Sequence, residues 1–148
     1  MLSLNDLDAK TKSETPVEIE YVLKDGTETG VIFRILGDES ETVLVASMTE
    51  LEKRQKRLAA IEALSSGVRG SSPKPNVEAD LAMNNRLTAC RLVGWSGIKE
   101  EWSPDNALKL VSSNSDVAAF VLEVSKGTSR FLQLKSKGSS TTPESNSN

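Results

Sequence analysis

Apolar and polar residues alternate along two short stretches near the start of the chain. Across 17–23 and 30–36, every second residue is apolar: Val17, Ile19, Tyr21 and Leu23, then Val31, Phe33 and Ile35. A period of two is typical of strands with one buried face. Because Asp25-Gly26 between them is a turn signal, the two stretches predict a β-hairpin. Two strands alone are marginally stable, so we expect this hairpin to pack on a helix or to join a partner's sheet.

The spacing then becomes helical. The acidic segment Asp38-Glu39-Ser40-Glu41 supplies a cap residue and complements a helix dipole, and it predicts a long helix that ends near Ala63 or Leu64. Helical spacing returns from Val77 and stops before Gly94. In the first of these helices Gln55 interrupts an apolar face that is otherwise formed by Leu44, Met48, Leu51, Leu58 and Ile61.

Three further segments follow in the last third of the chain. Two glycines flank the tryptophan of Gly94-Trp95-Ser96-Gly97, which predicts a loop. Ser103-Pro104-Asp105 is a strong start signal and predicts a short helix. A final helix is expected to begin after a cap at 113–115 and to continue as far as Phe131 and Leu134, with apolar positions at Val117, Phe120, Val121 and Val124.

These elements predict a single domain within the 148 residues. The expected fold class is α+β, mainly α, with an N-terminal β-hairpin followed by a bundle of about four helices. We place this domain at 16–137, after a flexible N-terminal segment at 1–15, and we expect a flexible Ser/Gly/Pro linker at 65–76. Residues 138–148 carry no apolar side chain and predict a disordered tail.

The composition excludes several kinds of chemistry. The chain has no histidine and a single cysteine, Cys90, so it lacks the usual general base and most ligands for transition metals. Cys90 falls on an apolar helical stripe and is interpreted as a buried structural thiol. No glycine pattern fits a phosphate loop or a dinucleotide fingerprint. We therefore expect no enzyme activity, no cofactor and no metal.

Charge and hydropathy narrow the class of partner. Lys plus Arg number 18 against 21 Asp plus Glu, so the net charge of -3 gives no general attraction to nucleic acid. The basic run at 53–57 is interpreted as a solvated helix face, with contact to an acidic partner as the alternative. The apolar runs are too short to span a bilayer, and nothing indicates a secretion signal. Among cellular compartments, a reducing cytoplasm fits these sequence features best.

Protein binding is the function class that remains. Tryptophan is rare in this chain and is enriched at binding hot spots. For Trp95, partner contact and a role in fixing its loop are weighted equally, whereas Trp102 beside a helix cap is better explained as a loop-fixing residue. The full set of candidate partner-binding residues is Trp95, Trp102, Phe120, Phe131, Leu51 and Leu58.

The order of segments also resembles one family of proteins, the tail assembly chaperones of long-tailed bacteriophages. The resemblance covers roughly Leu4 to Leu134 and is a pattern of order and spacing. The segments that carry it are Asp25-Gly26-Thr27-Glu28-Thr29-Gly30-Val31, Gly37-Asp38-Glu39-Ser40, Leu92-Val93-Gly94-Trp95-Ser96-Gly97 and Trp102-Ser103-Pro104-Asp105-Asn106-Ala107.

This resemblance implies a helper protein with no active site. It would bind the tape measure protein in the host cell cytoplasm, keep it soluble, recruit major tail tube subunits and be absent from the finished virion. Self-association is left open. The main alternative is a structural tail accessory or adaptor protein that stays in the virion and extends a neighbour's sheet with its hairpin. A small regulatory DNA-binding protein is a weaker third reading.

Overall fold

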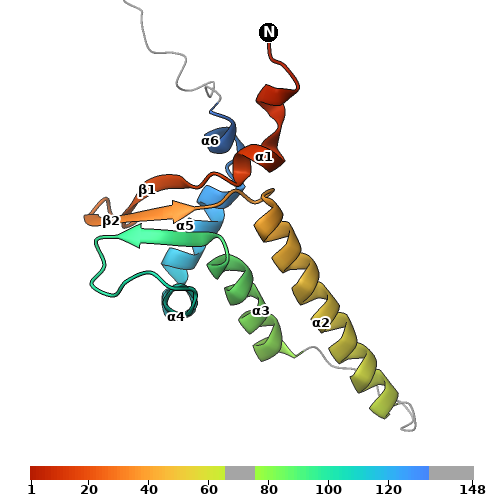
Figure 1. The fold of residues 1–148 in the computed structure, drawn as a ribbon. Helices are drawn as coiled ribbons and strands as arrows, with labels where there is room; N and C mark the ends of the chain where they lie inside the picture. Colours follow the sequence, from red (N-terminus) through yellow and green to blue (C-terminus); the bar gives the residue numbers. More distant parts are fainter. Residues whose placement is uncertain (66–75, 134–148) are drawn as a thin grey trace, which may run out of the picture.

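The computed structural model describes residues 1–65 and 76–133 and confirms a mixed α+β, mainly helical fold (Figure 1). Most of the predicted linker, the whole predicted tail and Leu134 lie outside the described residues. The prediction of one continuous last helix as far as Phe131 is wrong, because Gly127, with ψ 78°, leaves the helical conformation and divides it into two helices, Ser115–Lys126 and Thr128–Leu132. In chain order the elements are η1 (Asn5–Leu7), α1 (Ala9–Ser13), β1 (Val17–Val22), β2 (Glu28–Ile35), α2 (Glu41–Ser65), α3 (Val77–Ala89), β3 (Leu92–Ser96), α4 (Pro104–Ser113), α5 (Ser115–Lys126) and α6 (Thr128–Leu132).

The predicted hairpin is confirmed. β1 and β2 pair antiparallel, with Val17 opposite Ile35 and the register running on from there. At the turn, the Asp25 carboxylate accepts a hydrogen bond of 2.9 Å from the backbone N–H of Thr27. Gly26 has φ +93°, a left-handed conformation that costs glycine little.

A third strand joins the hairpin where the sequence predicts a loop. β3 pairs antiparallel with β2 and puts Gly94 opposite Arg34, so the predicted loop at 94–97 is wrong up to Ser96. Glycine is depleted in strands, but packing decides here, because a Cβ on Gly94 would lie only 3.1 Å from Cδ of Arg34. The helix before it, α3, ends at Ala89, earlier than predicted.

The core lies between the sheet and the last helices. α4 and α5 pack against the sheet, and the caps that begin them are the predicted ones: the Ser103 side chain accepts from the N–H of Asn106, and Asn114 caps α5. Each of these two caps satisfies N–H groups that would otherwise lack a partner. The core residues are nearly inaccessible: Phe33, Ile35, Leu92, Ala107, Val111, Val117, Val121 and Val124.

The segment predicted to be flexible, 1–15, contains η1 and α1. α1 packs against α6, and Ser13 at its end is only 2% exposed. Ser13 sits directly under Gly37, because a Cβ added to that glycine would fall 2.3 Å from the Ser13 hydroxyl oxygen. The N–H of Gly37 also donates to the carbonyl of Ser13 at 3.0 Å. The end of the segment is thus tied to the domain just before α2 begins.

α2 and α3 extend side by side away from the sheet, and α2 reaches further (Figure 1). Ion pairs join the two helices along their length. The pair furthest from the sheet joins Arg57 to Asp80 at 3.2 Å. Since 25 residues of helix at about 1.5 Å each span nearly 40 Å, α2 gives the molecule a long projecting arm.

Candidate protein-binding surfaces

Both tryptophans make internal hydrogen bonds that fix the loop between β3 and α4. The indole N–H of Trp95 donates to the carbonyl of Glu100 at 2.8 Å, and that of Trp102 donates to the carbonyl of Leu92 at 3.0 Å. The Trp95 ring also meets Phe33 edge-on, with centroids 6.5 Å apart. Each side chain is half-buried. These contacts match the loop-fixing role expected for Trp102 and give Trp95 the same role.

The other four candidates do not gather into one surface. Phe120 lies in an aromatic cluster, its centroid 5.1 Å from that of Tyr21, and Phe131 is only 5% exposed. Leu51 and Leu58 lie on α2, the first exposed and the second half-buried. The six predicted residues are therefore divided between the aromatic side of the core, the α6 region, the β3–α4 loop and the projecting arm.

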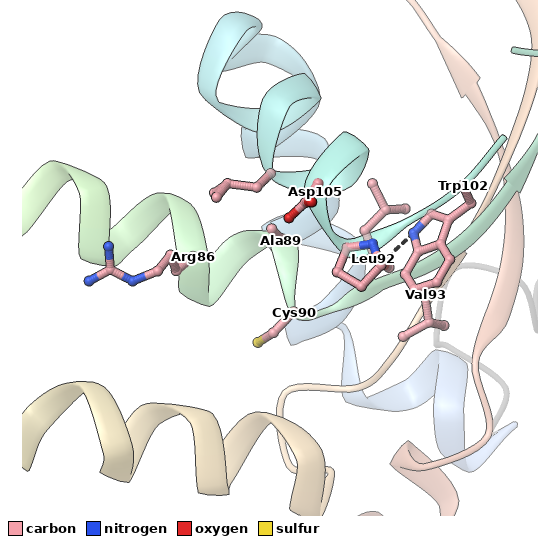
Figure 2. Close-up of a pocket in the computed structure, with 9 residues that line it drawn as sticks. Arg86, Ala89, Cys90, Leu92, Val93, Trp102 and Asp105 are labelled. Atoms are coloured by element: carbon pink, nitrogen blue, oxygen red, sulfur yellow. Dashed lines mark hydrogen bonds between the residues drawn. The ribbon is translucent and has the colours of Figure 1, made fainter. Parts of the chain in front are cut away.

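An apolar groove lies where α3, β3 and α4 meet. Figure 2 shows Arg86 at one end of it and Trp102 at the other, with Ala89 and Leu92 between them. Its volume is about 330 Å³. Because the indole N–H of Trp102 is already bonded to Leu92, that ring can offer an apolar surface to a ligand. The lining residues are Arg86, Ala89, Cys90, Leu92, Val93, Trp102, Pro104, Asp105 and Leu108.

The cysteine in this groove has no catalytic environment. Cys90 is half-buried, and burial raises the pKa of its thiol, which keeps it protonated and unreactive. Its Sγ donates to the carbonyl of Leu87 at 3.0 Å. Across 1–65 and 76–133 no three acidic, histidine or cysteine side chains come together as a metal site. Over the same ranges no helix is long and apolar enough to cross a membrane.

The face that α2 turns toward α3 is polar. The Glu50 carboxylate accepts two hydrogen bonds from the Arg86 guanidinium, at 2.7 and 2.9 Å, although Glu50 is only 8% exposed. These hydrogen bonds hold the pKa of Glu50 below its ordinary value. Further along, Asp80 of α3 pairs with Arg54 and Arg57. Lys53 also lies 3.8 Å from Glu50, so three of the four basic residues at 53–57 form ion pairs within the protein.

The predicted apolar face of α2 points largely to solvent. Leu44, Met48 and Leu51 are 38%, 69% and 51% exposed, whereas Val43 and Glu50 on the adjacent face are buried. The sequence pattern predicted this apolar face, and in the first half of the helix the structure leaves it exposed. The reason is that α3 meets α2 through charged side chains, which places the polar face inward and leaves the apolar stripe free for another surface.

A buried arginine that the sequence pattern did not single out fixes the base of the arm. Arg91 is 7% exposed, and its guanidinium donates to the Ser125 hydroxyl at 3.0 Å and to the Asp38 carboxylate at 2.5 Å. Ser125 in turn donates to the carbonyl of Leu36 at 2.8 Å. Asp38 was interpreted only as helix N-terminal charge. Its contact with Arg91 joins the start of α2 to β3 and α5, which no local motif could have indicated.

The chain matches no known family model, no curated protein and no solved structure in the comparisons made. Its function must be inferred from its own residues.

Proposed function

We propose that the protein is a tail assembly chaperone of a long-tailed bacteriophage, which acts in the host cell cytoplasm. It binds apolar helical segments of the tape measure protein, keeps that protein soluble and helps to recruit major tail tube subunits. The observation that carries the proposal is the apolar groove between α3, β3 and α4 (Figure 2). The order of segments that resembles this family supports it.

The groove suits side chains that project from one face of a client helix. At about 330 Å³ it lies at the small end of binding pockets, so it has room for one or two anchor side chains and not for a whole helix. Its polar residues, Arg86 and Asp105, are few among apolar neighbours. Amphipathic helices bind such grooves with anchors spaced three or four residues apart. A long client with repeated apolar positions offers many such anchors.

Co-expression with the tape measure protein tests the proposal. The Leu108→Glu variant places a carboxylate in the groove, and we expect it to leave most of the client in the insoluble fraction that wild type keeps soluble. Ser112→Glu is the matched control, since it adds the same charge at an exposed position of the same helix. Thermal melts of both variants will check that each is folded. A client that is equally insoluble with and without the wild-type chain would refute the proposal.

The sheet offers one observation in favour of a structural tail accessory or adaptor protein. The strand order is β1-β2-β3, so within the described residues β1 has no strand on its outer side and could extend a neighbour's sheet. Mass spectrometry of purified particles separates the two functions. We expect the protein to be absent from them, and stoichiometric recovery would favour the structural role.

A further inference from the structure

We propose that α2 is also a self-association surface, which pairs with α2 of a second copy in an antiparallel, two-fold arrangement. The surface is the exposed stripe formed by Leu44, Val45, Met48 and Leu51, with exposed fractions of 38%, 54%, 69% and 51%. Their spacing of three and four residues places them along one side of the helix. This inference does not depend on the proposed function, and it uses a different surface from the groove.

The stripe borders a hollow between α1 and α2. Its volume is about 480 Å³, and Lys10 of α1 and Glu14 just after α1 line it together with Glu41, Leu44, Val45 and Met48 of α2. Contiguous exposed apolar side chains with a charged rim are characteristic of protein interaction sites. The face of α2 that packs within the domain is a separate one, which includes Val43 and Glu50. The stripe can therefore bind a partner without disturbing the α2–α3 pairing.

The charges beside the stripe favour a second copy over an unrelated partner. With the two-fold axis at Met48, Val45 lies opposite Leu51 of the other copy, three residues away on either side of Met48. Glu41 lies seven residues before Met48 and Lys56 eight after it, so Glu41 of each copy comes next to Lys56 of the other. A two-fold interface must be complementary to itself, and this register satisfies that condition.

The rim of the hollow holds Lys10 together with Glu14 and Glu41, so it carries both signs of charge, and the orientation is decided by Glu41 and Lys56. A parallel arrangement would instead bring Glu41 against Glu41 and Lys56 against Lys56. Like charges in contact oppose association, so the antiparallel orientation is selected.

The area offered by part of one helix and the edge of α1 is below that of a standard stable interface, so association should be weak. We expect sedimentation equilibrium of the full chain to show a monomer–dimer equilibrium with a Kd on the order of 10–100 µM. Met48→Glu places two carboxylates at the two-fold axis and should weaken the dimer at least tenfold. Since Met48 is 69% exposed, the variant should fold normally, as its circular dichroism will show.

A charge swap tests the orientation. Glu41→Lys alone and Lys56→Glu alone should each weaken the dimer about threefold to tenfold, because each variant brings like charges together twice across the axis. The double variant restores opposite charges and should return the Kd to within about twofold of wild type. A chain that is monomeric at several hundred micromolar, a dimer unaffected by Met48→Glu, or a double variant no better than the single ones would overturn the proposal.

Discussion

Replacing Arg91 by methionine should destabilise the protein strongly for a single substitution. Methionine keeps most of the apolar stem and removes the guanidinium, which is buried and donates to Ser125, Asp38 and the carbonyl of Leu87. Hydrogen bonds that involve a charged group contribute roughly 1.5–3 kcal/mol each, but the separate values do not add. The loss is moderated because the Asp38 side chain is 41% exposed and can be solvated once its partner is gone.

We therefore expect the free energy of unfolding to fall by about 2–4 kcal/mol. This is somewhat less than the loss of stability that follows when a fully buried ion pair is broken. For a chain of this size that corresponds to a decrease in Tm of roughly 5–15 °C. Urea unfolding followed by tryptophan fluorescence gives the free energy, and circular dichroism gives the Tm. A fall in denaturant midpoint at constant slope would show that stability, and not the compactness of the unfolded chain, has changed.

Arg34→Met is the matched control, since it makes the same chemical change at an exposed ion pair. Arg34 lies 3.8 Å from Glu18, the two side chains are 51% and 67% exposed, and such surface pairs contribute at most about 1 kcal/mol. Methionine also keeps the stem that lies over Gly94. If Arg91→Met and Arg34→Met changed the free energy of unfolding by the same amount, the role assigned to Arg91 would be refuted.

Two further predictions concern the arm and the sheet. Glu50→Gln should lower the free energy of unfolding by about 1–2 kcal/mol at pH 7. Because the pKa of Glu50 is lowered in the folded state, this difference from wild type should persist above the ordinary glutamate pKa and shrink as the pH falls below it. A difference in free energy that grows in acid would contradict this. Gly97→Ala should cost about 2–4 kcal/mol in urea unfolding, since φ is +86° and the new Cβ would lie 2.4 Å from the carbonyl oxygen of Gly30. Gly26→Ala, with φ +93° but open space, should cost about 1 kcal/mol; equal costs would mean that the close approach at Gly97 is relieved by a small shift.

Local signals predicted most of the elements. Alternation and an Asp-Gly turn were sufficient for the hairpin, and the side-chain caps at Ser103 and Asn114 marked where α4 and α5 begin. β3 could not be predicted in this way. Its two neighbouring glycines lower strand propensity, and the pairing with β2 that compensates joins residues about sixty positions apart. Arg91 was missed for the same reason, because its partners come from α5 and from the start of α2.

The candidate surfaces were harder still, because an apolar stripe shows that a helix face is buried somewhere and not what covers it. On α2 the pattern identified Leu44, Met48 and Leu51 correctly as one face, yet α3 packs against the polar face beside it through Glu50 and Asp80. Charged pairs add little net stability, so they do not account for a strong attraction between α2 and α3. They do account for the position of the arm, which they fix while its apolar side stays exposed. If the apolar stripe were the internal face, α2 would pack more tightly and have nothing left to offer another chain.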